Sequence, residues 1–215
     1  MRKLVASYQS LLALVLLVMG MSAAQAQPAK GEDPYKLIQR VAESTFKRIA
    51  DDKAVITKDP NHLKTVVSEE LMPYINYKFA ARVVLGKVKA SKAEKKAFYE
   101  AFQGYLVTTY ATVFTKYTDQ KVVFEAPRSI EGKKVVTVKT RITDSARPDI
   151  HIDFKVRLNK KTGKWKAYDM VAEGISLLNS KKAELKAMLR QKDGVAKVTA
   201  ILNEKAQLNI KKDSK

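Results

Sequence analysis

The spacing of apolar residues along this chain changes from a helical repeat to a strand repeat and back again. Over residues 34–50 the apolar residues recur every three to four positions, after an Asp33 that is well suited to cap a helix. Further helices with one apolar face are predicted between Pro60 and Pro73 and over residues 75–85. The first part of the chain is therefore predicted to be mainly helical.

The longest predicted helix covers residues 91–117. It opens on Ser91 and Glu94, which form the S-x-x-E pattern of a capping box. This segment carries more aromatic residues than one buried stripe needs, so the helix is apolar on more than half of its circumference. Ordinary core packing explains the excess and is favoured on residue types alone. The alternative is a cavity between this helix and a sheet, because ligand cavities are lined mainly by apolar side chains.

Apolar and polar residues alternate in the middle of the chain, which predicts a four-stranded meander over residues 121–172. The alternation is clearest around Ile152 and Phe154, whose neighbours His151 and Asp153 predict a wet opposite face. The connecting turns are short, and short turns require antiparallel pairing. Two more helices are predicted after the strands. This order of elements predicts an α+β fold with the helices gathered on one face of a curved antiparallel sheet.

The beginning of the chain has the layout of a secretory signal. Arg2 and Lys3 precede an unbroken apolar run over residues 11–19, and Ala24 and Ala26 form an Ala-x-Ala cleavage site. We expect a signal peptide over 1–26 that is cleaved after Ala26. An uncleaved N-terminal anchor is the alternative, but the apolar run is short for a membrane span.

The rest of the chain is predicted to consist of a flexible leader (27–33), a single domain (34–210) and a polar tail (211–215). The sequence contains no cysteine. A disulfide and a lipoprotein anchor both require cysteine, so neither is available to this chain. We therefore expect an exported protein, located in the periplasm, whose fold depends on its apolar core alone.

Positive charge dominates the composition, with 41 Lys and Arg against 22 Asp and Glu and a formal net charge of +19. In a cytoplasmic protein this balance would suggest nucleic acid. Export leaves acidic lipid headgroups, lipopolysaccharide and acidic proteins as the polyanions within reach, and no nucleic acid is expected as a partner. A solvated, solubilising surface explains the charge equally well, because the lysines are spread along the chain.

Catalytic and metal-binding patterns are scarce in this sequence. The two histidines lie far apart in the chain, cysteine is absent, and no glycine-rich phosphate loop occurs, so no metal site and no cofactor are expected. Asp169, beside Tyr168 in the last predicted strand, is the one acidic residue of interest. It could act as a general base. A structural carboxylate is the favoured interpretation, since buried charges usually persist only when they are paired.

Three segments of this chain resemble the MlaC (toluene-tolerance auxiliary) family. Residues 165–176 (WKAYDMVAEGIS) are similar to the family pattern W-x-x-Y-D-x-x-x-E-G-[IV]-S, and residues 79–86 (FAARVVLG) are similar to a second family segment. The third segment is the predicted long helix with its regularly spaced aromatic residues. The chain departs from the family at residues 87–89, where Lys-Val-Lys stands in place of an aromatic residue found in many members.

The resemblance implies a periplasmic phospholipid carrier with no catalytic activity. Such a carrier shuttles lipid between an outer-membrane lipoprotein–porin complex and an inner-membrane ABC transporter complex, and so maintains the lipid asymmetry of the outer membrane. The implied fold is a twisted four-stranded sheet wrapped by helices, similar to the NTF2-like cone. Phospholipid would be cargo rather than cofactor, with its acyl chains in the interior of the protein, and we expect a monomer.

We expect the lipid cavity between the concave face of the sheet and the long helix. Its predicted lining consists of apolar residues from these stripes: Phe79, Val83, Phe102, Leu106, Val138, Ile152, Phe154 and Trp165.

Two other functions stay open. One is an NTF2-like periplasmic enzyme that uses Asp169 and Tyr168, and the other is an adaptor protein that binds through its basic surface. For a carrier, the positive surface is predicted to steer docking with partners. The lysines expected to take part lie at the ends of elements and in turns: Lys92, Lys95, Lys96, Lys160, Lys161, Lys181 and Lys182.

Overall fold

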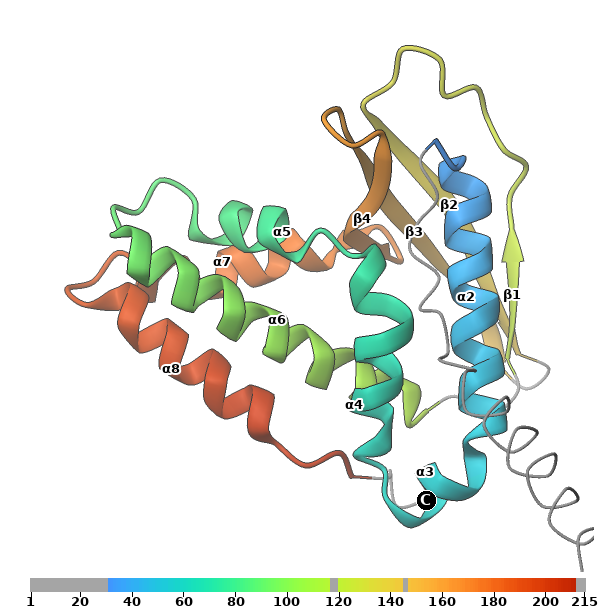
Figure 1. The fold of residues 1–215 in the computed structure, drawn as a ribbon, viewed down its shortest axis with the longest axis horizontal. Coiled ribbons are helices and arrows are strands. Elements are labelled where there is room, and N and C mark those ends of the chain that lie inside the picture. Colours follow the sequence, from blue (N-terminus) through green and yellow to red (C-terminus); the bar gives the residue numbers. More distant parts are fainter. Residues whose placement is uncertain (1–30, 117–119, 145–146, 212–215) are drawn as a thin grey trace, which may run out of the picture.

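The computed structural model describes residues 31–116, 120–144 and 147–211. The predicted signal peptide, most of the predicted leader and the last four residues lie outside the described residues. The described chain forms an antiparallel sheet, helix α2 (Pro34–Asp51), which covers one face of the sheet, and a layer of helices beside it (Figure 1).

The helices are α2 (Pro34–Asp51), α3 (Lys53–Lys58), α4 (His62–Val66), α5 (Tyr77–Leu85), α6 (Lys92–Phe114), α7 (Leu177–Leu189) and α8 (Gly194–Gln207). The strands are β1 (Lys121–Phe124), β2 (Val135–Asp144), β3 (Arg147–Asn159), β4 (Lys164–Ala172) and β5 (Ile175–Ser176).

The sheet is an antiparallel meander in the order β1-β2-β3-β4-β5, so each strand pairs with the next one along the chain. The predicted α+β class is therefore confirmed, with one addition: β5 is a fifth strand of two residues that the sequence pattern did not indicate. Between β3 and β4 the register shifts, because Lys155 pairs with Asp169 whereas Val156 pairs with Ala167. Tyr168 is thus the extra residue of a β-bulge, which bends the strand and redirects its side chains.

Helix α2 covers one face of the sheet and builds the first core with it. Asp33 caps the helix by accepting a hydrogen bond from the Tyr35 N–H at 2.8 Å. The apolar stripe of α2, including Leu37 and Val41, packs against β2, β3 and β4, where Val156 and Trp165 are buried. Burial of this stripe is what holds the helix on the sheet, since a helix of this length gains most of its stability from packing.

The second core lies within the helical layer formed by α5, α6, α7 and α8. The capping box of α6 is present: Ser91 Oγ accepts from the Glu94 N–H at 3.1 Å, and the Glu94 carboxylate accepts from the Ser91 N–H at 2.8 Å. Phe98 and Phe102 of this helix are buried among leucines and valines of α7 and α8. Helix α8 approaches α6 closely at Gly104, where an added Cβ would lie 3.0 Å from the Cβ of Ala206.

A third core joins the sheet part to the helical layer. Here the end of α2, helix α4 and the second half of α6 meet around Leu63, Val66 and Ala111. The helix that the sequence predicts between Pro60 and Pro73 is α4 followed by a π-helical turn, Val67–Leu71, and a 3₁₀ turn, Met72–Tyr74. None of the helices that the structure describes is both long and apolar enough to cross a membrane.

Candidate functional site

An apolar cavity of about 190 Å³ lies where α2 and the end of α6 face the sheet. Helix α2 contributes one wall, and β2, β3 and β4 contribute the other. The bulge in β4 and the π-helical turn lie at its margin, since Tyr168 and Leu71 both line it. Its wall from α2 and α6 includes Ile38, Val41, Phe46 and Phe114, and its wall from the sheet includes Ile142, Ile152 and Phe154.

The threonines of the cavity wall direct their hydroxyl groups to backbone carbonyls. Thr45 donates to the carbonyl of Val41 at 2.7 Å, within α2. Thr140 donates across the sheet to the carbonyl of Ile152, also at 2.7 Å. Because these hydroxyls are satisfied locally, the wall offers methyl groups and few free hydrogen-bonding atoms. Such a surface binds hydrocarbon better than it binds a polar ligand.

Tyr110 and Asp169 form the polar end of the cavity. Burial raises the pKa of the Tyr110 phenol to about 12, with smaller contributions from Asp169 and Tyr105 nearby. The phenol is therefore neutral at any physiological pH.

The carboxylate of Asp169 is fully engaged in structural contacts. One oxygen accepts from the backbone N–H of Leu178 at 3.1 Å, and the other accepts from Ser176 Oγ at 2.8 Å and lies 3.3 Å from the Lys155 ammonium. Ser176 in turn caps α7 by accepting from the Asn179 N–H at 3.0 Å. Asp169 thus ties the end of the sheet to the start of α7. These contacts match the structural interpretation of this residue rather than the general-base interpretation.

Seven of the eight residues predicted to line the cavity occupy three places in the structure. Ile152 and Phe154 lie on the cavity wall. Val138 and Trp165 are buried in the core between α2 and the sheet. Val83, Phe102 and Leu106 pack within the helical layer.

Phe79, the eighth, is enclosed by cations and by Tyr168. The guanidinium groups of Arg82 and Arg157 lie 5.1 and 4.4 Å from the centre of its ring. Tyr168 packs edge-on against the same ring at 5.1 Å. Contact of any of the eight residues with a ligand stays a prediction.

Sequence reasoning missed the contribution of α2 to the cavity, made through Ile38, Val41 and Phe46. It also missed Tyr110 and Phe114 as lining residues, although both lie off the main stripe of the predicted long helix. Aromatic residues outside the buried stripe were the feature of the sequence that could have identified them as lining residues. The regular apolar face of α2 gave no such signal, because it resembles the face of any core helix.

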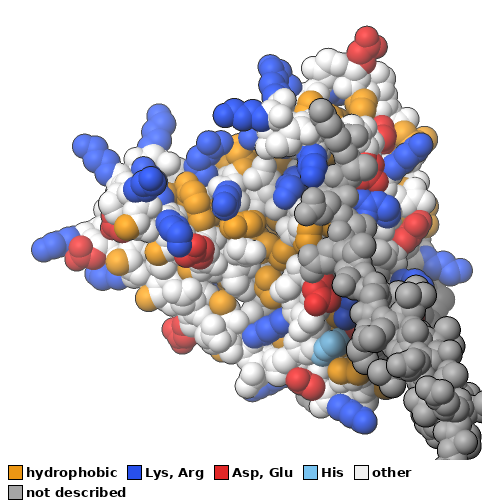
Figure 2. Space-filling model, viewed as in Figure 1, with side chains coloured by type: hydrophobic (Ala, Val, Ile, Leu, Met, Phe, Trp, Pro, Cys, Tyr) orange, Lys and Arg blue, Asp and Glu red, His pale blue; other side chains and the backbone are white. Residues whose placement is uncertain are grey.

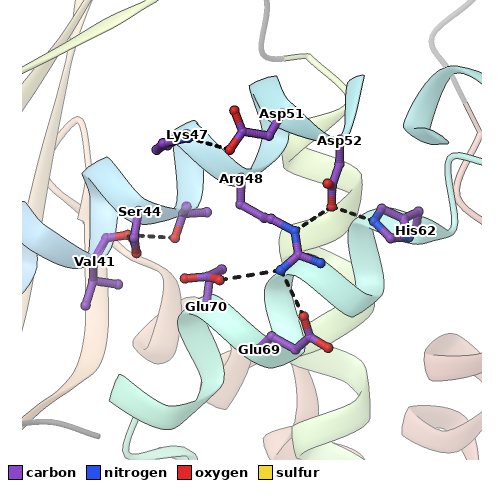
Figure 3. A network of polar contacts seen from close by, with 10 residues as sticks. Val41, Ser44, Lys47, Arg48, Asp51, Asp52, His62, Glu69 and Glu70 are labelled. Carbon is purple, nitrogen blue, oxygen red and sulfur yellow. Dashed lines mark hydrogen bonds and ion pairs between the residues drawn. The ribbon is translucent and has the colours of Figure 1, made fainter. Parts of the chain in front are cut away.

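An ionic network holds the C-terminal end of α2 against α4 and the π-helical turn (Figure 3). Arg48 lies 2.6 Å from Asp52, 3.2 Å from Glu69 and 3.8 Å from Glu70, and His62 Nε2 lies 2.7 Å from the same Asp52 oxygen. Hydrogen bonds from His62 and Arg48 lower the pKa of the Asp52 carboxyl below its ordinary value. The network therefore joins two elements that also wall the cavity, α2 and the π-helical turn.

Metal binding has no support from side-chain clustering. Over residues 31–116, 120–144 and 147–211 there is no group of three His, Cys, Asp or Glu residues that could hold a metal ion. His62 is engaged with Asp52, and His151 lies on the exposed part of β3.

Comparison with known proteins points to one family. The profile of a family described as "MlaC protein" matches residues 39–204. A curated relative from Haemophilus influenzae, the "intermembrane phospholipid transport system binding protein MlaC", is 34% identical over 148 residues, which cover 67% of this chain and 69% of the relative.

The fold is similar to that of a solved phospholipid-binding protein from Ralstonia solanacearum in complex with a phospholipid. The TM-score is 0.72 at 18% sequence identity, and the match covers 81% of this chain and 97% of the other. At this level of identity the likeness is one of fold.

Proposed function

Because this chain belongs to the MlaC family, we propose that it is a periplasmic phospholipid carrier that holds acyl chains in the cavity between α2, α6 and the sheet. The observation that carries this proposal is the apolar lining of that cavity, in which even the threonine hydroxyls are satisfied by backbone carbonyls. The relative from Haemophilus influenzae is named for phospholipid transport, and the similar fold from Ralstonia solanacearum was solved with a phospholipid.

The energetics of acyl chains explain why such a carrier needs a closed apolar site. Each methylene group that moves from water to an apolar site contributes about 0.8 kcal/mol. An acyl chain of about fifteen methylenes would thus cost roughly 12 kcal/mol to hold in water. A protein that carries a lipid across an aqueous compartment must cover most of this surface, whereas the headgroup can stay in water.

The size of the cavity sets a condition on loading. An engineered protein cavity of about 150 Å³ accommodates one benzene molecule. The cavity of about 190 Å³ therefore has room for only part of one acyl chain. Binding a diacyl lipid requires α2 and the end of α6 to move away from the sheet. These helices are the movable walls, because the opposite wall is a continuous hydrogen-bonded sheet.

The proposed role includes movement of lipid between an outer-membrane complex and an inner-membrane transporter complex, in support of outer-membrane lipid asymmetry. The support for this step is the name of the relative, which assigns that protein to an intermembrane system. We do not assign a catalytic role to Asp169 and Tyr168. Both oxygens of Asp169 are occupied by Ser176, Leu178 and Lys155.

The test is mass spectrometry of the organic extract from protein purified out of the periplasm without detergent. We expect about one diacyl phospholipid per chain, and the intact mass of the same sample reports whether residues 1–26 are removed. An extract free of phospholipid would refute the carrier function.

A matched pair of variants on β1 locates the lipid. Val122 lines the cavity, whereas its neighbour Val123 is exposed to solvent. Val122→Arg should lower the lipid content several-fold, because an arginine there is buried without a partner when the cavity is filled. Val123→Arg adds the same charge to the same edge strand and should leave lipid content unchanged. Equal lipid content in both folded variants would place the acyl chains elsewhere.

A further inference from the structure

A second concave site, which we call the basic groove, lies at the outer end of the helical layer. It is a groove of about 920 Å³ between the end of α5, the connection over residues 86–89, and the face of α7 and its end over residues 179–191. It shares no lining residue with the apolar cavity. The two sites are therefore separate in their lining, and a role for the groove does not rest on the proposed function.

The rim of the basic groove carries only positive charge. Five cationic side chains line it, all of them exposed, and no Asp or Glu does. Among the described residues none of the five forms an ion pair with a carboxylate. Figure 2 shows Lys and Arg side chains gathered over this end of the helical layer, beside apolar ones. The five are Lys87, Lys89, Lys182, Lys186 and Arg190.

The spacing of charges on α7 sets this surface apart from the other helices. Lys182, Lys186 and Arg190 follow one another at intervals of four residues, which places three like charges along one face of the helix. On the other described helices no more than two like charges follow one another at this interval, as in Lys78 and Arg82 of α5. There the interval also joins opposite charges, as in Lys96–Glu100 at 2.6 Å. Like charges at this spacing repel one another and destabilise a helix slightly, so pairing within α7 does not explain the arrangement.

Helix dipoles do not account for the charge of the groove. Both α5 and α7 end here, and a helix C-terminus carries roughly half a unit of negative charge. Two such ends would be balanced by a single cation, whereas the rim holds five. The excess is available to an anionic ligand.

The floor of the groove is apolar. Val84, Leu85 and Leu189 line it and are buried, and Val88 is half-buried beside them. A concave site with an apolar floor and a cationic rim fits an extended segment in which carboxylates alternate with apolar side chains. A flat bilayer surface could touch the rim but could not reach the floor.

We propose that the basic groove is a docking site for an acidic, partly apolar peptide segment of a partner protein. The rim charges attract the carboxylates and raise the association rate, and the floor takes up the apolar side chains. Docking at this site leaves the cavity free, so the protein can hold its lipid while it is bound to the partner.

The test uses a short fluorescent peptide in which Glu and Leu alternate, and fluorescence anisotropy as the measure of binding to the purified full chain. Lys182→Glu/Lys186→Glu should weaken binding about tenfold or more at low salt, because two attractive contacts become repulsive. The control Lys53→Glu/Lys58→Glu makes the same change in net charge at two exposed positions of α3, outside the groove. Its binding should fall far less than that of the groove variant, since charges outside the groove act on the peptide only through the long-range field, which salt screens.

Hydrogen exchange on the unaltered protein gives a second readout that does not depend on a variant. The peptide should protect residues 84–90 and 179–191 and leave β1 and β2 unprotected. Equal loss of binding in both variants, or protection spread evenly over the surface, would overturn the proposal. So would binding of the groove to phosphatidylcholine vesicles that contain phosphatidylglycerol when the peptide does not bind, because the ligand would then be a membrane.

Discussion

The apolar cavity and the basic groove are two concave sites in one chain that follow opposite physical rules. The cavity is the smaller, about 190 Å³ against about 920 Å³, yet its threonine hydroxyls are satisfied by backbone carbonyls and its wall is mainly apolar. The groove keeps its cations in water, and within the part of the chain that the structure describes none of them pairs with a carboxylate. Burial of apolar surface gives affinity that salt hardly weakens, whereas exposed charge gives attraction that salt screens. Volume alone would favour the groove, whereas the chemistry of the lining favours the cavity as the site for hydrocarbon.

Helix α7 connects the two regions. Its first residues are fixed by Asp169, which also lines the cavity, and its last residues form one side of the basic groove. The two sites are therefore separate in their lining but share one structural element. Variants of each site should separate their functions, and a variant of Asp169 should affect the element they share.

The largest effect is expected for an arginine in the cavity wall. Phe154 lies on β3 opposite Val138 and Met170, at the centre of the sheet wall. Phe154→Arg should lower the lipid extracted per chain by about tenfold or more, because an unpaired buried charge costs several kcal/mol. Phe154→Leu keeps the wall apolar and should retain most of the lipid. The groove variant Lys182→Glu/Lys186→Glu should carry the normal amount.

Quantitative phosphate analysis of extracts, together with circular dichroism to check folding, decides this prediction. If the groove variant loses lipid as strongly as Phe154→Arg, the two sites are not independent and the contrast between them fails.

The sequence was sufficient to predict most of the elements, with the short α3 and β5 as exceptions, but not which neighbour each apolar side chain would meet. Helix α6 illustrates both outcomes. Ser91 and Glu94 predicted its start, and the structure contains that capping box. Phe102 and Phe114 are both apolar and look equivalent in the sequence. At 3.6 residues per turn, however, they lie about 120° apart around the helix axis. Phe102 therefore packs within the helical layer, whereas Phe114 faces the cavity and meets Phe46 edge-on.

The spacing of apolar residues also could not predict local irregularities in the helices and strands. The bulge at Tyr168 and the π-helical turn, Val67–Leu71, each add a residue to a regular pattern, and both contribute to the cavity margin. Such insertions depend on tertiary packing, so an alternation of apolar and polar residues cannot locate them. The basic groove was missed for a related reason. Its two charged segments are about a hundred residues apart in the chain and meet only in the fold.

A moderate effect on stability is expected for Asp169→Ala. The substitution leaves the Leu178 N–H and the Lys155 ammonium without their carboxylate, and the Asp169 side chain is only 3% exposed. Breaking a buried pair of this kind lowers the free energy of unfolding by about 3 kcal/mol. For a chain of this size that is a fall of roughly 6–12 °C in Tm.

Asp169→Asn keeps one oxygen that can accept from Leu178 and should lose less. Thermal unfolding followed by circular dichroism measures both variants. The folded fraction of each should still carry lipid, because Asp169 contacts α7 rather than supplying the apolar wall. An unchanged Tm for Asp169→Ala would mean that Asp169 does not hold α7 to the sheet.

The smallest effect is expected for Tyr110→Phe, which removes the phenol at the polar end of the cavity. Burial raises the pKa of this phenol from 10.0 to about 12, so it is uncharged at neutral pH in both the folded and the unfolded chain. Lipid content at pH 6–9 should therefore be unchanged, in contrast to the salt-sensitive behaviour of the groove.

The difference should appear only in alkali. Above pH 10 the unfolded chain loses the Tyr110 proton while the folded chain keeps it until about pH 12, so the stability of the unaltered protein falls across this range. Tyr110→Phe removes that part of the fall, up to about 3 kcal/mol, and the variant should unfold at higher pH. Tyr99→Phe on the same helix, which packs in the helical layer away from the cavity, serves as the control.

An alkaline unfolding curve that is the same for Tyr110→Phe and the unaltered protein would show that the phenol is not buried in the cavity. The polar end of the cavity would then be wet, and the contrast with the basic groove would be one of charge rather than of exposure to water.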